Sequence, residues 1–372
     1  MRVLLLSNND IGLYKFRKEL IVALKEEKHD VFFCVPDGPC VDTIKELGCE
    51  FIPCDLIDRH GRNPFKDLQL INFYKKTLKV LKPDIVFTYT IKPNVYGGIA
   101  CSKLKIPFVS NVTGLGTSIE NGGFTKRVSL FLYKIGMKKA KKVFFQNEEN
   151  EAFLLKNKII KCPYDLLPGS GVNLSQYKYM PLPDDGLLHF AFVARIMKEK
   201  GIEQYLDAAI YIKEKYPQTR FHVCGYCEQN YEERIKELVE KEIVIYHGLV
   251  DDMSNIYRIV CCVVHPTFYP EGLSNVLLES CASGRPIITT DRSGCREVVD
   301  NGLTGFIVKQ KDSLDLINKI ETFISLDKNT RAKMGIAARK KVEQEFDRRI
   351  VVDKYLKEIE SVVELNELQK DL

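Results

Sequence analysis

Short apolar runs alternate with amphipathic helical stretches along almost the whole chain. In the first half, the runs that predict strands are Val3–Ser7, Val31–Val35, Phe51–Cys54, Ile85–Tyr89, Phe108–Asn111, Val143–Gln146 and Asp165–Leu167. In the second half, they are Leu188–Val193, Arg220–Cys224, Ile243–Tyr246, Cys261–His265, Pro286–Thr289 and Phe306–Val308. Helical patterns such as Tyr14–Glu27 and Pro64–Leu81 lie between them. Strands that are apolar on both faces and alternate with helices predict parallel sheets covered on both sides.

The alternation lapses once, at residues 175–187, where prolines and polar residues predict a linker. The linker separates two predicted domains, residues 1–174 and 188–345, and a length of 372 residues suits two domains. After about Ser325 the pattern is helical, and we expect the segment 346–372 to pack back across both domains. The predicted fold class is therefore α/β, with two doubly wound Rossmann-like domains and a cleft between them.

The loops at the carboxyl ends of the strands are where ligands of such sheets bind. This rule places five segments around the predicted cleft. They are Ser7–Gly12, Tyr89–Asn94, Asn111–Gly116, Ala194–Lys200 and Pro266–Asn275.

The most informative stretch runs from His265 to Glu279. It predicts a helix that starts after the N-cap Ser274 and stops at Gly284. Glu271 lies just ahead of this helix and Glu279 lies in its second turn. Free N–H groups at a helix start attract an anion, and flanking carboxylates accept hydrogen bonds from hydroxyls. A sugar nucleotide has that pattern of groups, although a solvated helix start with a dipole-complementing acid is equally compatible.

Two cations follow the first strand of the second domain. Arg195 leaves the strand end, and Lys200 stands just before the next helix. Together they can bracket a diphosphate, although they can also be solvated loop cations. Cations and helix N–H groups at one edge would neutralise a leaving diphosphate, which is where negative charge develops in glycosyl transfer.

Several common nucleotide and metal motifs are missing from the sequence. It has no Asp-x-Asp triplet and no P-loop, so we expect neither a metal-anchored diphosphate nor phosphoryl transfer of the common kind. Ser7–Gly12 is not a dinucleotide fingerprint, and Gly114-Leu-Gly116 lacks its third glycine. We therefore expect no metal and no cofactor.

A redox alternative comes from Cys224-Gly-Tyr-Cys227, which follows a strand and precedes a helix predicted from about Glu228. This order resembles a thioredoxin-type site. The twelve cysteines are otherwise typical of reduced, buried thiols.

These motifs together resemble family-4 glycosyltransferases of the GT-B fold. The matches are the E-x7-E of Glu271 and Glu279, Arg195 with Lys200-Gly201, and Ser293–Glu297 followed by Asn301–Phe306. The resemblance implies retention of configuration, with Arg195 and Lys200 on the diphosphate, Glu279 on the ribose and Glu271 on the donor sugar. The donor-binding residues it implies are Gly12, Arg195, Lys200, Gly225, Leu249, Val250, Glu271, Gly272, Leu273, Ser274, Asn275 and Glu279.

The first half is similar to a narrower group, which extends polyprenyl-diphosphate-linked glycans, often with N-acetylgalactosamine. The matches are Ile91–Gly97, Asn111–Gly116 and Tyr14-x-Phe-Arg17. The acceptor-side residues this implies are Tyr14, Arg17, Thr90, Asn94, Thr113 and Gly114. Many relatives place a histidine on this side, and the Tyr89–Asn94 loop has none. Lys92 is therefore a catalytic candidate beside Glu271, Arg195 and Lys200.

The charge is unevenly distributed along the chain. Residues 1–172 carry a net charge of +9 and residues 173–372 carry −4. The segment 121–142 has no acid and interleaves cations with Phe131, Leu132, Tyr133, Ile135 and Met137. Such a helix can lie on an anionic bilayer, or it can be a sheet-covering helix with a solvated lysine face. We expect a cytoplasmic protein, peripheral on the inner face of the plasma membrane, with no nucleic-acid partner.

The hypothesis from the sequence is transfer of a hexosyl or N-acetylhexosaminyl group from a nucleotide diphosphate sugar, with UDP preferred, to a lipid-linked glycan. Four alternatives stay open. They are a GT-B-fold sugar-nucleotide epimerase, a transferase with a soluble acceptor, a non-catalytic sugar-nucleotide sensor and the thiol redox protein.

Overall fold

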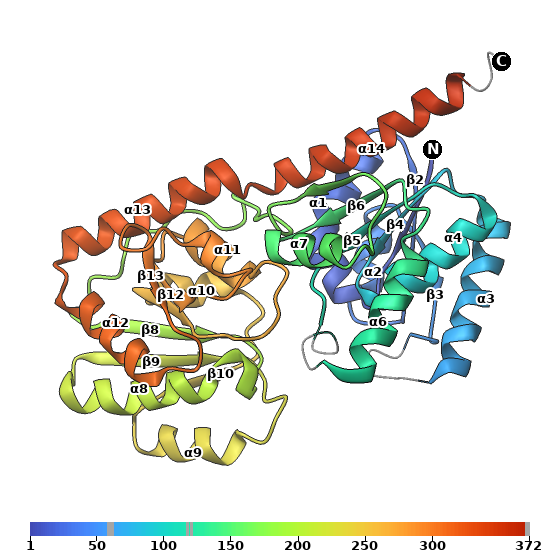
Figure 1. Ribbon diagram of the computed structural model, residues 1–372. Coiled ribbons are helices and arrows are strands. Elements are labelled where there is room, and N and C mark those ends of the chain that lie inside the picture. The colour runs from blue at the N-terminus through green and yellow to red at the C-terminus, as the bar shows by residue number, and fades with distance from the viewer. Residues whose placement is uncertain (58–62, 117–118, 120–121, 369–372) are drawn as a thin grey trace. The chain divides into compact units, whose positions relative to one another are not determined.

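The computed structural model describes residues 1–57, 63–116, 119 and 122–368 (Figure 1). The chain forms two compact units. Unit 1 comprises Met1–Gly171 and Arg348–Leu372, and unit 2 comprises Val172–Asp347. These divisions differ by a few residues from the boundaries expected at 174 and 345, and the terminal segment belongs to unit 1.

Unit 1 is built on one parallel sheet with the strand order β3-β2-β1-β4-β5-β6-β7. The order reverses between β1 and β4, which makes this the topological switch point of the unit. The strands are β1 (Arg2–Leu6), β2 (Asp30–Val35), β3 (Glu50–Pro53), β4 (Ile85–Tyr89), β5 (Phe108–Val112), β6 (Lys142–Phe145) and β7 (Tyr164–Leu166). The helices are α1 (Asp10–Glu26), α2 (Val41–Glu46), α3 (Pro64–Leu81), η1 (Pro93–Gly97), α4 (Gly98–Leu104), α6 (Gly123–Gly136), α7 (Glu148–Lys156) and α14 (Arg348–Leu368).

Two apolar layers enclose this sheet. Helices α1 and α14 cover one face, and α3, α4 and α6 cover the other. Glycines set how closely α6 packs on η1 and α4. A Cβ on Gly98 would lie 2.2 Å from the carbonyl oxygen of Gly136, and a Cβ on Gly136 would lie 2.6 Å from the Cα of Val95. Only glycine permits this backbone approach.

Unit 2 repeats the architecture with a six-stranded parallel sheet of order β10-β9-β8-β11-β12-β13. Its switch point lies between β8 and β11. The strands are β8 (Leu188–Val193), β9 (Thr219–Cys224), β10 (Ile245–Gly248), β11 (Cys262–His265), β12 (Ile287–Thr290) and β13 (Gly305–Val308). The helices are η2 (Lys198–Lys200), α8 (Ile202–Lys215), α9 (Glu232–Glu240), α10 (Met253–Ile259), α11 (Asn275–Ala282), η3 (Arg296–Val298), α12 (Ser313–Ser325) and α13 (Lys328–Glu345).

The segment 175–187 is held against unit 2 by buried arginine contacts. Arg285 is fully buried and donates to the carbonyl oxygens of Tyr257 (2.5 Å), Met180 (2.5 Å) and Pro181 (3.0 Å). Arg339 donates to the carbonyl oxygen of Tyr177 at 2.7 Å. This segment is therefore an anchored part of unit 2.

The predicted fold class is confirmed, and each predicted strand corresponds to an observed strand in chain order. Two helix starts were wrong. Helix α1 begins four residues earlier than expected, because the Asn9 side chain caps it by accepting from the N–H of Gly12 at 2.5 Å. Helix α9 begins at Glu232, and the residues after Cys227 form a turn.

Three histidines form a hydrogen-bonded row across neighbouring strands of unit 2. His222 lies 2.9 Å from both His189 and His247 through ring nitrogens, and His189 lies 2.9 Å from a carboxylate oxygen of Asp185. The carboxylate can only accept, so each imidazole must donate towards Asp185. Burial, and then the neighbouring histidines, lower the pKa of His222 to about 3. His222 therefore stays neutral in the folded protein above about pH 3.

We predict that this row makes the folded state sensitive to mild acid. The ordinary pKa of 6.5 for His222 applies to the unfolded chain, so below pH 6.5 the unfolded state binds a proton that the folded state does not. Stability is retained above that pH and falls towards pH 3 by about 1.4 kcal/mol per pH unit. Urea unfolding between pH 7.5 and 5 should show a smaller loss in His222→Gln than in wild type. His29→Gln, in unit 1, is the control, and an equal pH slope in all three proteins would contradict the prediction.

Candidate active site

The candidate site lies at the switch point of unit 2, where β8 and β11 end side by side. Arg195 follows β8, Lys200 ends η2, and His265 ends β11. The rule for parallel sheets places ligands at this point. The structure therefore brings together the residues that the sequence predicted from separate loops.

The two loops are joined by backbone contacts. Gly201 adopts a left-handed φ of 78°, and a Cβ there would lie 2.1 Å from the carbonyl oxygen of Pro266. The carbonyl oxygen of Glu199 accepts from the N–H of Phe268 at 2.9 Å and from the Thr267 hydroxyl at 3.2 Å. This close approach carries Lys200 to Glu271.

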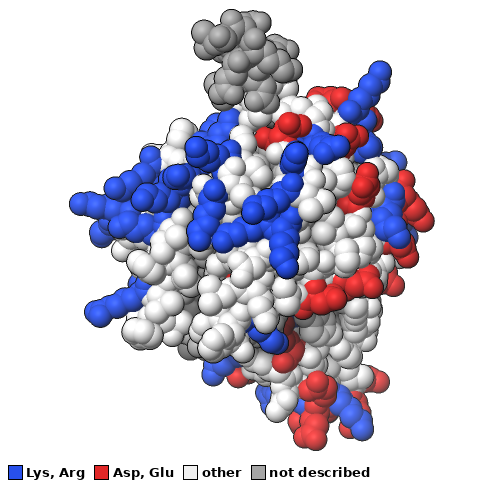
Figure 2. All heavy atoms as spheres, turned by 90° about the vertical axis from the view of Figure 1, so that its right-hand side faces the viewer, with Lys and Arg blue, Asp and Glu red and all other residues white. Residues whose placement is uncertain are grey.

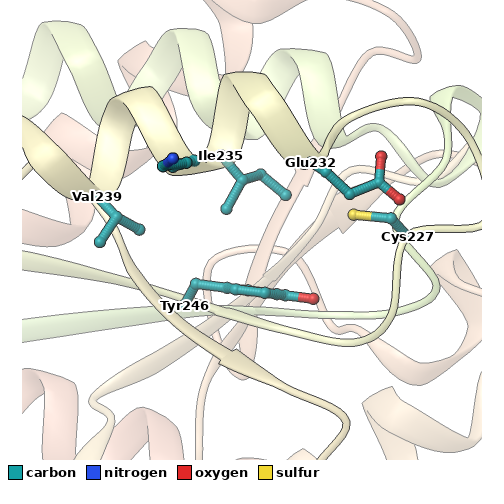
Figure 3. A pocket seen from close by; sticks show the side chains of 6 residues that line it. Cys227, Glu232, Ile235, Val239 and Tyr246 are labelled. Carbon is teal, nitrogen blue, oxygen red and sulfur yellow. The ribbon is translucent and has the colours of Figure 1, made fainter.

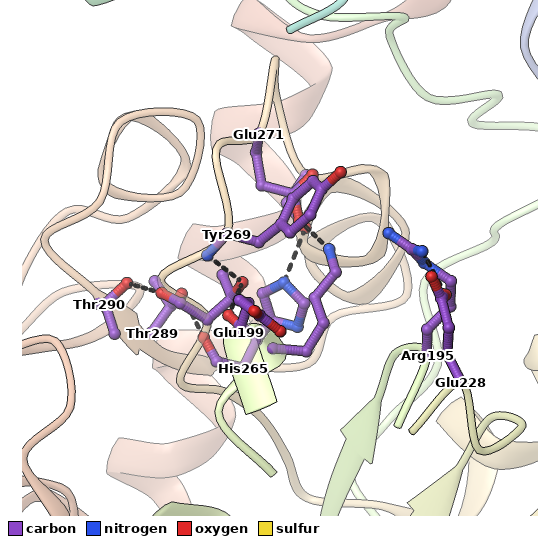
Figure 4. Close-up of polar contacts among 11 residues, drawn as sticks. Arg195, Glu199, Glu228, His265, Tyr269, Glu271, Thr289 and Thr290 are labelled. Atoms are coloured by element: carbon purple, nitrogen blue, oxygen red, sulfur yellow. Dashed lines mark hydrogen bonds and ion pairs between the residues drawn. The ribbon is translucent and has the colours of Figure 1, made fainter. Parts of the chain in front are cut away.

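Each of the two predicted cations has an acidic partner. Lys200 forms an ion pair with Glu271, and Arg195 forms one with Glu228 (Figure 4). Both cations also lie near the ring of Tyr269, with the Arg195 guanidinium carbon 5.4 Å and the Lys200 amine 4.8 Å from its centroid. An aromatic ring attracts cations through its π system. Tyr269 therefore helps to position both.

The electrostatics of the pair keep Glu271 ionised. Burial acts to raise the pKa of Glu271, but Lys200, His265 and Arg195 outweigh it and lower the pKa below its ordinary value. Burial, and then Lys200, lower the pKa of His265 to about 3, so its imidazole is neutral. Its Nε2 lies 3.3 Å from the Ser274 hydroxyl, and its Nδ1 has no hydrogen-bond partner among the described residues.

Helix α11 starts at this site as predicted. Ser274 occupies the N-cap position, but its side chain makes no capping hydrogen bond. Ser274 is one of the predicted donor-binding residues, but its backbone N–H is not free, because it donates to the carbonyl oxygen of Gly294 at 2.8 Å. The N–H groups of Asn275 and Val276 have no such partner in the described part of the chain. They are the amides that can bind an anion.

The second acid of the pair lies one turn further on. Glu279 is in the second turn of α11 and accepts a hydrogen bond from the Tyr257 hydroxyl at 3.3 Å. Burial raises the pKa of Tyr257 well above its ordinary value, so this hydroxyl remains a donor. Two carboxylates thus flank the first turn of the helix.

The other donor-binding candidates differ in setting. Gly225 has a φ of 142°, and a Cβ there would lie 1.8 Å from the carbonyl oxygen of Ala194, so this glycine is needed for packing beside Arg195. Leu249 and Val250 follow β10, and Leu249 is exposed. Leu273 is buried beneath the helix start. Gly12 belongs to unit 1, at the start of α1.

The acceptor-side candidates all lie in unit 1. Asn94 is fully buried, accepts from Thr88 at 2.6 Å and donates to the carbonyl oxygen of Asn111 at 2.8 Å, so it positions the loop. Lys92 pairs with Asp67 at 3.0 Å. Thr90 has a left-handed φ of 69°. The remaining candidates are the half-buried Tyr14, Thr113 and Gly114 and the buried Arg17.

The chain matches two protein-family models. Residues 181–341 match the model described as Glycosyl transferases group 1, and residues 2–147 match the model described as Glycosyl transferase 4-like. The chain is a glycosyltransferase of the GT-B fold. The solved structure of Anabaena Alr3699/HepE in complex with UDP-glucose has the same fold, with a TM-score of 0.79 and 19% identity over 97% of this chain and 100% of that one.

Two relatives align with most of this glycosyltransferase. One is the N,N'-diacetylbacillosaminyl-diphospho-undecaprenol alpha-1,3-N-acetylgalactosaminyltransferase of Campylobacter jejuni, which is 28% identical over 98% of this chain and 99% of its own. The other is the UDP-Gal:alpha-D-GlcNAc-diphosphoundecaprenol alpha-1,3-galactosyltransferase of Escherichia coli, which is 27% identical over 83% and 84% of the two chains.

The redox alternative was wrong. Burial raises the pKa of Cys224 to about 12 and also raises the pKa of Cys227, whereas a reactive dithiol needs a lowered pKa. Cys227 instead lines a cavity of about 290 Å³ with Glu232, Ile235, Val239 and Tyr246 (Figure 3). Among the described residues, no three His, Cys, Asp or Glu side chains are grouped in a way that could hold a metal ion.

Sequence reasoning missed Tyr269, Glu228 and His265 in this glycosyltransferase. Tyr269 lies two residues before Glu271, and its ring contact with both cations depends on the folded loop. Glu228 reaches Arg195 from the loop after β9. His265 was visible only as the end of a strand. A search for polar residues at all three neighbouring strand ends would have flagged each of them.

We predict that Glu271→Gln destabilises the folded glycosyltransferase by about 3 kcal/mol, because it leaves Lys200 largely buried without its counter-ion. The double variant Glu271→Gln with Lys200→Met should regain most of that loss. Chemical denaturation of the four proteins in a double-mutant cycle measures the coupling. The control is Glu237→Gln, which removes an exposed partner of Lys241 and should change little. Additive losses from the two site variants would contradict the prediction.

Proposed function

We propose that this glycosyltransferase moves a hexosyl or N-acetylhexosaminyl group from a UDP-linked sugar to a polyprenyl-diphosphate-linked glycan. One observation carries the donor side of the proposal. Arg195, Lys200 and the first turn of α11 meet at a single strand edge, together with the ionised Glu271. That edge offers positive charge and free amides to a diphosphate, and a carboxylate to a sugar hydroxyl.

The charge at this edge suits departure of a nucleoside diphosphate. Arg195 has a planar fork that can hold two phosphate oxygens, and Lys200 acts as a point charge. Their present partners, Glu228 and Glu271, hold both cations in place through ion pairs. A diphosphate carries more negative charge than either carboxylate and can compete for both cations. The same groups then stabilise the charge that develops as the diphosphate leaves.

We propose that Glu271 acts on the donor sugar as a fixed hydrogen-bond acceptor. Its lowered pKa keeps it ionised, and its tie to Lys200 limits the freedom that a nucleophile would need. The proposal therefore assigns it to binding and orientation, with Glu279 on the ribose. Retention of configuration and catalysis by side-chain cations instead of a metal complete the mechanism we propose.

The acceptor assignment is supported by the two relatives. Both names specify a saccharide joined through a diphosphate to undecaprenol and an alpha-1,3 linkage, and they align with 98% and 83% of this chain. We propose an acceptor of the same chemical class here. Lys92 is retained as a candidate catalytic residue in unit 1, although its pairing with Asp67 makes a role in holding the loop equally suitable.

We further propose that α6 docks on the inner face of an anionic plasma membrane. Phe124, Val128, Phe131 and Ile135 recur at helical spacing and are exposed, with Phe124 at 81% and Phe131 at 62%. In the view of Figure 2, lysine and arginine side chains gather on one side and acids on the other. None of the described helices is both long enough and apolar enough to cross a bilayer.

The structure narrows the set of residues available for that docking. Lys141 and Lys142 lie 2.5 Å and 2.6 Å from the carboxylate of Glu358 on α14, so their charges are paired within unit 1. Arg127, Lys134, Lys138 and Lys139 are exposed, and each would contribute about 1 kcal/mol near an anionic surface. Asn121, the first residue of the predicted membrane segment, lies outside the described residues.

We predict that Arg195→Gln and Lys200→Gln each lower kcat/KM by about 10²–10³, because each removes one positive group from the departing diphosphate. Turnover with a panel of labelled UDP-sugars and a lipid-diphosphate glycan measures this. Lys198→Gln is the matched control, since Lys198 lies on the same turn, is 63% exposed and pairs with the partly exposed Glu203.

The same assay separates the alternatives. A sensor would bind UDP-sugars without turnover, an epimerase would convert the donor without an acceptor, and a soluble-acceptor enzyme would ignore the lipid. Unchanged kcat/KM in both site variants would overturn the donor assignment.

We predict that the double variant Phe124→Ala with Phe131→Ala binds phosphatidylglycerol vesicles at least tenfold more weakly than wild type. In the double variant Arg127→Gln with Lys134→Gln, vesicle binding should no longer depend on the salt concentration. Vesicle co-sedimentation at several salt concentrations measures both effects. Val80→Ala, at an equally exposed apolar position in the last turn of α3, should bind like wild type. Equal losses in this control and the α6 variant would argue against a specific docking helix.

A further inference from the structure

A buried polar cluster lies at the topological switch point of unit 1. Arg17 comes from α1, Tyr89 ends β4, Asn111 lies near the end of β5, Gln146 follows β6, and Tyr355 comes from α14. Tyr89 is the register partner of Asn111, and Asn111 is the partner of Phe144, two residues before Gln146. These residues therefore lie on one face of the sheet, under α1 and α14. We call them the Arg17 cluster.

Arg17 differs from the other buried arginines of the protein. Arg285 donates to three carbonyl oxygens, and Arg348 donates to Gly171, Lys15 and Glu19. Arg17 is only 4% exposed, yet it donates to the carbonyl oxygen of the neighbouring Phe16 at 2.7 Å, and its Nε has no hydrogen-bond partner in the described part of the chain. Its guanidinium otherwise stacks on the Tyr89 ring at 4.7 Å. A buried cation of this kind is costly unless something compensates its charge.

The cluster also holds further unsatisfied polar atoms. Within the described chain, the buried Arg17 Nε, Tyr89 hydroxyl, Gln146 Nε2 and Asn111 Oδ1 have no hydrogen-bond partner. Buried polar groups are nearly always paired, so a group of unpaired atoms indicates an occupant. Three of these atoms can donate, and they accompany a cation. That composition suits an anion better than a neutral ligand.

The surrounding backbone supports a binding role. Thr90, directly after Tyr89, has a φ of 69°, which is rare for a β-branched residue. Such strain concentrates at ligand sites. Thr90 and Thr113, at the ends of β4 and β5, are partly exposed, so solvent reaches this edge of the sheet.

We propose that the Arg17 cluster is a second anion site of the enzyme, which binds a phosphoryl group of the acceptor diphosphate. Arg17 supplies the charge, Tyr89 and Gln146 donate to phosphoryl oxygens, and Asn111 accepts from a hydroxyl. All of its residues belong to unit 1, whereas Arg195 and Lys200 belong to unit 2. The identity of the ligand rests on the function proposed above, whereas the anion site itself does not.

The test uses full-length protein in which Arg195→Gln and Lys200→Gln silence the donor site. Isothermal titration with inorganic pyrophosphate measures the remaining binding, before and after adding Arg17→Gln. We expect at least tenfold weaker binding with Arg17→Gln, partial recovery with Arg17→Lys, and no change with Lys18→Gln, an exposed cation one residue along α1. As a control for misfolding of the silenced variant, the same titration is made with wild type whose donor site is saturated with UDP.

Several outcomes would overturn the proposal. No pyrophosphate binding in the silenced protein, or equal affinity with Arg17→Gln, would mean that water alone fills the cluster. Strong destabilisation of Arg17→Gln without anion, by thermal unfolding, would indicate a purely structural arginine, whereas we expect a melting temperature equal to or above that of the parent.

A competition step identifies the source of the anion. Farnesyl diphosphate should displace pyrophosphate from the silenced protein, and UDP should not. Displacement by UDP alone would overturn the acceptor assignment. The kinetic test of Arg195→Gln and Lys200→Gln leaves Arg17 intact. A failure of the donor proposal would therefore appear in those kcat/KM values, separately from the pyrophosphate titration.

Discussion

The Lys200–Glu271 ion pair is the interaction on which the donor side of this glycosyltransferase depends. The two residues come from loops on either side of the unit 2 switch point, and the approach of Gly201 to Pro266 brings them together. Their charges then set the states of their neighbours, since Glu271 remains ionised and His265 remains neutral. Without this pair, Arg195 would be the remaining positioned cation near the start of α11 among those described above.

The acidic partners of Arg195 and Lys200 explain how two cations persist in a mostly buried edge before a donor arrives. An unpaired cation there would carry a desolvation cost, and a carboxylate offsets it. The carboxylates also compete with the donor. A diphosphate must either displace them from Arg195 and Lys200 or share these cations with them. Tyr269 reduces the reorganisation needed, since its ring holds both cations whichever anion they contact.

The sequence was sufficient for the features that depend on local pattern. The strands and the start of α11 after Ser274 follow from periodicity and residue type, and the structure confirms both, although the Ser274 side chain makes no capping hydrogen bond. The sequence was insufficient where the register between strands or the conformation of a loop determines which side chains come into contact. The Arg195–Glu228 pair and the histidine row join residues more than 20 positions apart. The burial of Asn94, whose amide contacts two strands, is likewise a tertiary property.

The two units differ in how the charge of a buried cation at the switch point is compensated. In unit 2 the cations at the switch point have carboxylate partners from their own unit, so their charges are neutralised locally. In unit 1, Arg17 has an aromatic ring and one carbonyl oxygen instead. A cation–π contact offsets far less than the cost of burying a charge. We attribute the remaining compensation to the proposed anion, because the surplus of donors around Arg17 favours an anion over water, which donates as readily as it accepts.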